Sequence, residues 1–331
     1  MTNSSPAFSV IIPCYNAETY IGALLDSLIA TRYPALEILC LDDLSRDHTR
    51  DIVARYAERY PAIHLITHTV NQGPGLLRAE GLRRATSDYV LIADADDFYE
   101  PDLLAHLADV ITTHPDIDVI EFPFYVVRGQ DRRVAPWLNR GQSGLRTTAN
   151  ENIMLDTALW NKCYRRDFLL KHRLYETPRT HRTSCGEIPA HICSLLVAGR
   201  FYWMNHAGYN YRIVDNSLCH DSRQDARFLS DVWLTLDDLK SELQRLNVYQ
   251  QDDYIRYCAT VLNWHITGKF SKTDAYRTYY NRVRSFMQAH RSILTSDKNF
   301  RRIIKRPYWF MMLGQRFKQI RRRFIVQPTL Q

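Results

Sequence analysis

The chain lacks the sequence features that mark secretion and membrane spanning. The stretch from Met1 to Pro6 has neither a basic start nor an apolar block, so we expect no signal peptide. No apolar run approaches the ~20 residues that a helix needs to cross a bilayer. The longest run near the end of the chain, Tyr308 to Leu313, is far shorter. We therefore expect a cytoplasmic protein without a transmembrane helix.

Cysteine pairs with regular spacing are also missing. The seven cysteines are an odd number, and no two of them are spaced as Cys-x-x-Cys. This pattern favours free thiols in a reducing cytosol over a disulfide framework or a zinc site. Cys14, Cys40 and Cys163 lie in apolar, strand-like segments, so we expect them to be small core residues.

Acidic residues are absent from the last part of the chain. Residues 298–331 contain ten Lys or Arg and no Asp or Glu, in a chain whose net charge is +7. The remainder keeps 33 of the 43 basic residues against 36 acidic ones, a balance of −3. A strongly basic segment beside a mildly acidic body indicates a phosphate-bearing partner, either a membrane surface or a nucleic acid.

The basic segment has an amphipathic pattern. Leu313, Phe317, Ile320 and Phe324 are spaced four, three and four residues apart, so they share one helical face. This is typical of a helix lying in a membrane interface and attracted to anionic lipid. A core-packing helix with a solvated basic face is the alternative. Because no nucleic-acid recognition fold accompanies the patch, we expect residues 298–331 to bind an anionic membrane surface and no nucleic acid.

The N-terminal part alternates between strand and helix patterns. Strands are expected at residues 8–12, 37–41, 63–67, 89–93 and 118–122, and helices at 16–28, 48–60, 74–85 and 101–113. This alternation predicts an α/β fold with a mostly parallel sheet and right-handed crossovers. Asn16 and Asp47 are expected to cap the first two helices.

The pattern changes twice beyond residue 122. Glycine, proline and arginine break it into excursions or a hairpin up to residue 158, and shorter elements follow at 159–164, 188–198, 201–204 and 209–213. Beyond Asp221 only helical patterns remain. We therefore expect three parts, which are a catalytic-type α/β domain at 1–220, a helical extension at 221–297 and the basic segment at 298–331.

The most informative stretch runs from Tyr89 to Asp97. A short apolar run, typical of a buried strand, ends in Asp94, Asp96 and Asp97. Carboxylates at the end of a strand lie at the edge of an open sheet, where such folds bind ligands. Crowded negative charges need neutralisation, and a divalent cation shared with a phosphate group provides it through oxygen ligands. An acidic turn that precedes the next helix is the alternative.

Four motifs occur in an order that is typical of one family. They are Val10-Ile11-Ile12-Pro13-Cys14-Tyr15-Asn16, Leu41-Asp42-Asp43-Leu44-Ser45, Asn71-Gln72-Gly73 with Arg78, and Asp94-Ala95-Asp96-Asp97, with Trp160-Asn161-Lys162 and Gly208-Tyr209-Asn210-Tyr211-Arg212 as later landmarks. In these motifs residues 8–217 resemble family 2 glycosyltransferases of the GT-A fold. The resemblance implies a Rossmann-like sheet flanked by helices, and metal-dependent, inverting transfer of a sugar from a nucleotide-sugar donor.

The resemblance also implies where the donor binds. The nucleotide-sugar-binding residues would be Pro13, Tyr15, Asn16, Asp43, Asn71, Gly73, Arg78, Asp94, Ala95 and Asp96. Asp43 would accept a hydrogen bond from the uracil ring, Asp96 would ligate Mn²⁺ or Mg²⁺, and Asp94 would reach the ribose or a metal-bound water. The cation would neutralise charge that grows on the diphosphate as the sugar leaves. The structural alternatives are a simple turn at Pro13 and Tyr15, a helix cap at Asp43 and a solvated Arg78.

The acceptor side is less complete. Family members commonly have a Glu-Asp pair at a helix start, whereas residues 184–189 contain Glu187 as their only acid. We expect Glu187 to be the base that deprotonates the acceptor hydroxyl, with an interaction with the helix dipole as the alternative. The candidates for contact with acceptor or diphosphate are Trp160, Lys162, Arg182 and His220, each with a structural or surface role as its alternative.

The resemblance, together with the basic segment, implies a glycosyltransferase that moves a sugar from a UDP-sugar donor to a glycan or lipid-linked acceptor. The acceptor class would be a cell-surface polysaccharide or lipopolysaccharide, made at the inner face of the cell membrane. A sugar nucleotidyltransferase would need a glycine-rich, lysine-bearing loop after the first strand, and residues 13–16 lack one. A non-catalytic, membrane-associated scaffold stays open, because the Glu-Asp pair is incomplete.

Overall fold

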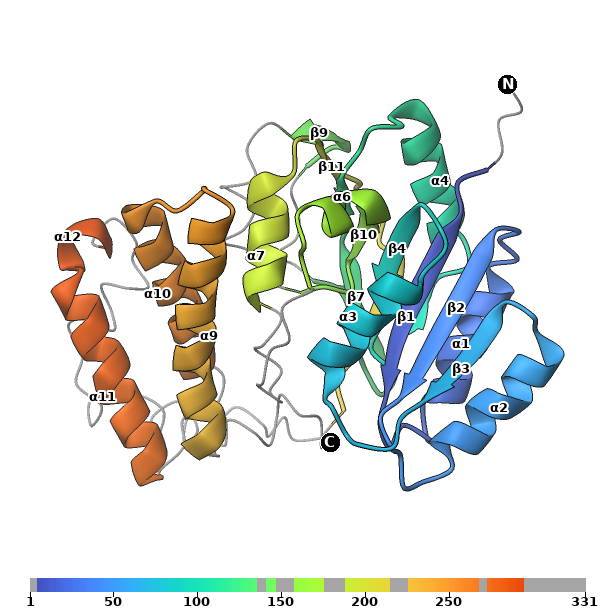
Figure 1. The fold of residues 1–331 in the computed structure, drawn as a ribbon, viewed down its shortest axis with the longest axis horizontal. Helices are drawn as coiled ribbons and strands as arrows, with labels where there is room; N and C mark the ends of the chain where they lie inside the picture. The colour runs from blue at the N-terminus through green and yellow to red at the C-terminus, as the bar shows by residue number, and fades with distance from the viewer. Residues whose placement is uncertain are drawn as a thin grey trace, which may run out of the picture. The chain divides into compact units, whose positions relative to one another are not determined.

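The chain folds as two compact units, Met1–Ser217 and Leu218–Gln331. The computed structural model describes residues 5–135, 141–146, 158–175, 188–214, 226–267 and 273–294. Within these residues the first unit contains strands and helices, and the second contains helices only (Figure 1).

Strands and helices alternate through the first unit. In chain order they are β1 (Phe8–Cys14), α1 (Ile21–Ala30), β2 (Leu36–Asp42), α2 (Thr49–Arg59), β3 (Ile63–Thr67), α3 (Pro74–Arg84), β4 (Tyr89–Ile92), β5 (Phe98–Tyr99), α4 (Leu103–Thr113), β6 (Val119–Glu121), β7 (Phe124–Arg128), β8 (Asp131–Val134), β9 (Gly144–Arg146), β10 (Lys162–Arg165), α6 (Arg166–Lys171), α7 (Ile188–Val197), β11 (Phe201–Trp203) and β12 (Tyr209–Arg212). This order confirms the α/β class that the sequence predicts.

The main sheet has the strand order β3-β2-β1-β4-β10-β6-β11-β9. Neighbours among β1 to β4 are parallel, with Phe8 opposite Leu36 and Tyr89. β10 is antiparallel to both β4 and β6, and β9 is antiparallel to β11. The sheet is therefore mostly parallel, as predicted, while β9 and β10 run antiparallel to their neighbours.

Both faces of β1 are covered. Val10 and Ile12 belong to a buried core that includes Leu24 and Leu28 of α1. Ile11 points to the opposite face, where a Cβ on Gly81 of α3 would lie 2.4 Å from Ile11 Cγ2. Only glycine permits this close approach of α3, which lies on the near side of the sheet in Figure 1 while α1 lies behind it.

The chain passes from β1 to β2 and β3 on one side and returns to β4 on the other. In an open parallel sheet, such a reversal of strand order leaves a crevice at the carboxyl ends of the strands. Cys14, Asp42 and Ile92 end the three strands around this point. The fold thus brings the first, second and fourth sequence motifs to one edge of the sheet.

A second sheet has the order β5-β12-β7-β8. β7 and β8 form an antiparallel hairpin, in agreement with the expected hairpin after residue 122. β12 pairs in parallel with β7, and Tyr209 and Asn210 pair with Tyr99 and Phe98 of β5. The two-residue strand β5 is too short for a periodic pattern, so sequence reasoning missed it. This short ladder connects the acidic turn to a segment distant in sequence.

Two predicted helix caps differ from the structure. α1 begins at Ile21 rather than next to Asn16, whose φ of 50° places it in a left-handed turn. The amide oxygen of Asn16 accepts from the backbone N–H of Arg46 instead of capping α1. α2 begins at Thr49, and Asp47 accepts from the backbone N–H of that residue at 3.0 Å although His48 occupies the N-cap position.

The second unit is helical over its described residues. Its helices are α9 (Ala226–Arg245), α10 (Gln251–Thr267), α11 (Asp274–Ala289) and α12 (Arg291–Leu294), in agreement with the helical pattern expected beyond Asp221. Thr273 caps α11 by accepting from the N–H of Tyr276, and the guanidinium of Arg282 lies 4.1 Å from the centre of the Trp233 ring. No helix in the described part of the chain has the length and hydrophobicity needed to cross a bilayer. The predicted membrane segment, 298–331, lies outside the described residues.

Candidate active site

The acidic turn follows β4 at the carboxyl edge of the main sheet. Ala93 continues the strand by donating its N–H to the carbonyl of Ile11, and the N–H of Asp97 then closes a turn on the carbonyl of Asp94 at 3.1 Å. Asp94 and Asp96 are half-buried, while Asp97 is fully buried. The turn therefore directs two carboxylates toward the crevice edge and one into the protein.

Asp97 connects the turn to β12. The hydroxyl of Tyr209 donates to Asp97 Oδ2 at 2.6 Å, and the backbone N–H of Arg212 donates to Oδ1 at 2.7 Å. Burial, together with the charges of Asp96 and Asp94, raises the pKa of Asp97, and these two hydrogen bonds oppose the rise. Its role is to fix the turn, and sequence reasoning missed Tyr209 and Arg212 as the residues that hold it.

Two further contacts from β12 hold the same turn. The hydroxyl of Tyr209 accepts from the backbone N–H of Asp94 at 3.1 Å. Arg212 Nε donates to the backbone carbonyl of Asp96 at 2.8 Å, and its guanidinium lies over the rings of Tyr20 and Phe98. The motif Gly208 to Arg212 stands out in the sequence, but its spacing does not show what it contacts.

Arg78 forms an ion pair with Asp94. Its Nη2 lies 2.6 Å from Asp94 Oδ1, and the residue is only 7% exposed. The alternative of a solvated surface arginine is therefore wrong. The structure joins the third and fourth motifs through this pair, which neutralises one of the three clustered carboxylates.

Asp96 has no such partner. Within the described ranges, no other residue pairs with its carboxylate by a hydrogen bond or ion pair. Burial, and next the charge of Asp94, raise the pKa of Asp96 to about 6. A half-buried carboxylate whose ionisation is disfavoured in this way suits a divalent cation, because the cation would supply the missing positive charge through an oxygen ligand.

Asp43 organises the second and third motifs. Its carboxylate accepts from the backbone N–H of Gln72 at 2.7 Å and from that of Gly73 at 2.8 Å, and Asn71 Nδ2 donates to its carbonyl. Gly73 has a φ of 85°, which favours glycine, and α3 begins directly after it. Asp43 thus holds the loop before α3 and does not cap a helix, while its contact with a uracil ring stays a prediction.

The loop after β1 lies against the loop after β2. The backbone N–H of Asn16 donates to Ser45 Oγ at 3.1 Å, and the side-chain oxygen of Asn16 accepts from the backbone N–H of Arg46. Pro13 lies within the carboxyl end of β1, and the ring of Tyr15 is 48% exposed beyond it. The exposed ring is available to contact a nucleotide base, and this role also stays a prediction.

Trp160 and Lys162 lie in the interior. The Trp160 ring stacks on the rings of Tyr209 and Tyr211, with centroids 4.7 and 5.0 Å away, so it supports β12. Lys162 is fully buried, with its Nζ donating to the carbonyl of Ala158 and to Asn161 Oδ1. This burial favours a structural role for Lys162 over contact with an acceptor.

Three other predicted residues lie outside the described residues. They are Arg182, Glu187 and His220. Helix α7 begins at Ile188, directly after Glu187, as the sequence predicts.

Comparisons with known proteins show the fold and the family. The structure is similar to the first 349 residues of Staphylococcus aureus TarS, in a crystal structure with UDP-GlcNAc, at a TM-score of 0.67 and 24% identity. The match covers 86% of this chain and 81% of that one, and it shows that the fold is the expected GT-A architecture. Residues 9–173 match the model of glycosyl transferase family 2, and the chain belongs to this family.

Two curated relatives show how far the likeness extends. An uncharacterized glycosyltransferase of Escherichia coli K12, YibD, is 32% identical over 191 residues, which are 53% of each chain. The poly(ribitol-phosphate) beta-N-acetylglucosaminyltransferase TarS of S. aureus MW2 is 32% identical over 176 residues, 51% of this chain and 29% of TarS. The chain therefore spans about half, or less, of the curated relatives to which it is compared.

Proposed function

We propose that this protein is a glycosyltransferase that moves a sugar from a UDP-sugar donor to a glycan or lipid-linked acceptor in cell-surface polysaccharide synthesis. The main support is the convergence of Asp43, Arg78, Asp94 and Asp96, from three separate motifs, at the carboxyl edge of one sheet. TarS, whose fold is similar, was crystallised with UDP-GlcNAc. The names of the matched relatives support the same reaction class.

Asp96 is the residue that fits a divalent cation, Mn²⁺ or Mg²⁺. When bound, such an ion supplies Lewis-acid stabilisation of the leaving diphosphate. Arg78 removes the second acidic charge by pairing with Asp94, so one carboxylate is left for the ion. Tyr209 and Arg212 keep the turn in place, since both bind it through hydrogen bonds of 2.6 to 3.1 Å.

Glu187 is the proposed base. A single-displacement reaction with inversion needs one carboxylate to accept the proton of the acceptor hydroxyl. The position of Glu187, directly before α7, agrees with that of the acidic residues which family members place at a helix start. Its oxygens would orient the hydroxyl and receive the proton, while the donor residues would hold the diphosphate.

Turnover of a panel of nucleotide sugars, with and without Mn²⁺, tests the proposal. We expect Asp96→Ala to lower the rate of sugar transfer by about 10³-fold or more, because a cation supplies several kcal/mol to such a step. Glu187→Gln should lower transfer while UDP still binds. Asp51→Ala, at an exposed position on α2, is the matched control and should keep full activity. Equal turnover of Asp96→Ala and the unchanged chain would refute the assignment. UDP binding without any turnover would instead support the scaffold alternative.

We also propose that residues 298–331 attach the protein to an anionic membrane surface. The ten basic residues support this, since each contributes about 1 kcal/mol near such a surface. In sedimentation with vesicles that contain anionic lipid, the full chain should be found in the pellet with the vesicles. A chain that ends at residue 297 should stay in the supernatant. Recovery of the full chain in the supernatant, at low salt, would contradict the proposal.

A further inference from the structure

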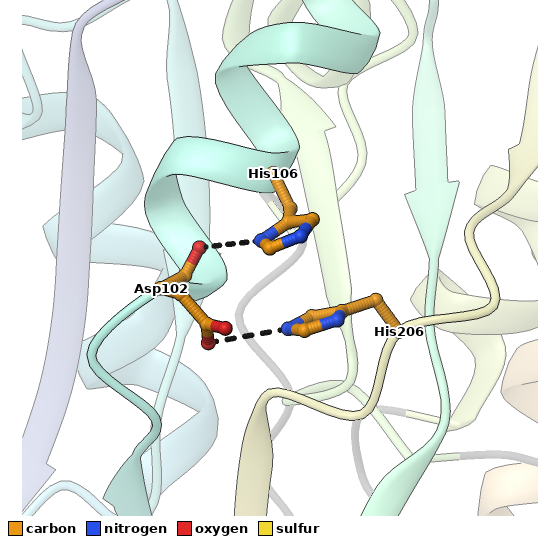
Figure 2. A group of neighbouring side chains, drawn as sticks. All are labelled: Asp102, His106 and His206. Atoms are coloured by element: carbon orange, nitrogen blue, oxygen red, sulfur yellow. Dashed lines mark hydrogen bonds and ion pairs between the residues drawn. The ribbon is translucent and has the colours of Figure 1, made fainter.

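A second group of metal-ligating side chains lies beside the short β5–β12 ladder (Figure 2). Asp102 and His106 are four residues apart at the start of α4, so they share one helix face. His206 comes from the connection between β11 and β12, and its Nε2 lies 3.2 Å from Asp102 Oδ1. One ligand atom from each of the three residues lies within 4.8 Å of the others.

The backbone around His206 is fixed in several places. The N–H of Asn205 donates to Ser143 Oγ at 2.9 Å, and the N–H of Glu100 donates to the carbonyl of Gly208 at 2.9 Å. A Cβ on Gly208 would lie 2.4 Å from Leu103 Cδ1, so only glycine allows this segment to lie so close to α4. The approach of His206 to the helix is therefore built into the fold.

The two histidines are arranged as a pair. Their rings stack with centroids 3.8 Å apart and an angle of 11° between the planes. His106 Nδ1 lies 2.9 Å from the backbone carbonyl of Asp102, a contact that requires a proton on Nδ1 and leaves the lone pair on Nε2. Metal-binding histidines are commonly oriented by such a bond from the second ring nitrogen.

We propose that Asp102, His106 and His206 bind a divalent transition-metal ion of the Zn²⁺ class. Two imidazole nitrogens and one carboxylate are a ligand set that Zn²⁺ takes, with a fourth position open to water. Metal–ligand bonds of about 2.0–2.2 Å require the two rings to rotate toward Asp102, while the backbone positions are already set.

This site is distinct from the donor site. In the described part of the chain, the side chains of Asp102, His106 and His206 make no hydrogen bond or ion pair with the acidic turn, although Tyr209, three residues after His206, does. The donor site offers oxygen ligands that suit Mg²⁺ or Mn²⁺, and imidazole nitrogen is preferred by Zn²⁺, Co²⁺ and Ni²⁺. An ion here would tie α4 to the segment that leads into β12.

Co²⁺ is the probe that separates the two sites, because nitrogen ligands in a low-coordinate site give it a visible absorption band. The full chain, purified without a histidine tag and free of nucleotide, is titrated with CoCl₂ at pH 7.5. We expect a saturable band in the unchanged chain, in Asp96→Asn and in His64→Ala, which removes an exposed histidine on β3. His206→Ala and His106→Gln should each weaken Co²⁺ binding by more than about 10- to 100-fold. That range is the loss expected when only a group that hydrogen-bonds to a metal ligand is removed, and here a ligand itself is removed.

Two results would overturn the proposal. One is the absence of a saturable band in the unchanged chain, and the other is equal Co²⁺ affinity in the two histidine variants and the unchanged chain. Thermal unfolding without metal checks that the variants fold, since neither histidine belongs to the buried core. Asp96→Asn alters the donor site but is expected to keep the Co²⁺ band. The Co²⁺ titration therefore tests this site independently of the proposed donor site.

Discussion

The surroundings of Lys162 and the acidic turn both bury charge, and they differ in how that charge is balanced. Around Lys162 the balance is internal, since Nζ lies 3.3 Å from Oε1 of the equally buried Glu121 and donates to Ala158 and Asn161. In the acidic turn Arg78 balances Asp94, but no described side chain pairs with Asp96. Burial and a neighbouring negative charge hold its pKa near 6.

The difference teaches how to separate structural charge from functional charge. A buried charge that is paired inside the fold favours one conformation, and removing its partner is costly. A carboxylate that no positive group of the fold neutralises lowers the stability of the free protein. A bound cation can restore that stability. The two regions should therefore respond to substitution with opposite signs.

The largest expected effect is at the balanced region. Lys162→Met should lower the free energy of unfolding by about 3–5 kcal/mol, because Glu121 is left buried with an uncompensated charge. Urea unfolding of the purified variants measures this. Lys171→Met, at an exposed position at the end of α6, is the control and should be near neutral. A loss below about 1 kcal/mol in Lys162→Met would show that the pair is not a structural ion pair.

A smaller loss is expected where β12 holds the acidic turn. Tyr209→Phe removes the hydroxyl that bonds both Asp97 and Asp94, so it should cost about 1–3 kcal/mol of unfolding free energy. It should also weaken UDP binding, because the turn loses a support. Tyr202→Phe is the matched control, since the Tyr202 hydroxyl makes no hydrogen bond in the described part of the chain. Equal effects of the two substitutions would show that the Tyr209 hydroxyl does not support the acidic turn.

The smallest effect has the opposite sign. A raised pKa means that Asp96 favours the folded state when protonated, and this contribution is lost as the pH rises from about 4 through about 6. Asp96→Asn should therefore raise the unfolding temperature of the cation-free protein by a few degrees at pH 8 and by nothing at pH 4. Asp51→Asn serves as the exposed control. A variant that is less stable at pH 8 would mean that Asp96 is already neutralised within the fold.

The sequence predicts the repeated part of the fold well. β1 to β4 and α1 to α3 have the apolar periodicity of buried strands and amphipathic helices, and each lies near its predicted range, except that α1 begins only at Ile21. The antiparallel direction of β10 and the short strand β5 depend on where the chain re-enters the sheets, which local periodicity does not encode. The cap at Asn16 failed because its amide binds Arg46, a residue 30 positions away.

The candidate site follows the same division. Crowded aspartates at a strand end predicted the acidic turn, because their cost is evident from charge alone. The burial of Arg78 and the support from β12 were not predictable, since the bond from Arg212 to Asp97 joins residues 115 positions apart. Lys162 was expected to be near the surface or the crevice, and the partner that allows its burial, Glu121, is on another strand.

The cation dependence of UDP binding tests the central claim most directly. Isothermal titration of UDP into the unchanged chain, with and without Mn²⁺, compares the heat and the affinity, and the same titrations are made with Asp96→Asn. We predict saturable binding that is much tighter with Mn²⁺ in the unchanged chain and a loss of that gain in the variant. UDP affinity that is the same with and without Mn²⁺, or a gain that survives in Asp96→Asn, would contradict the account.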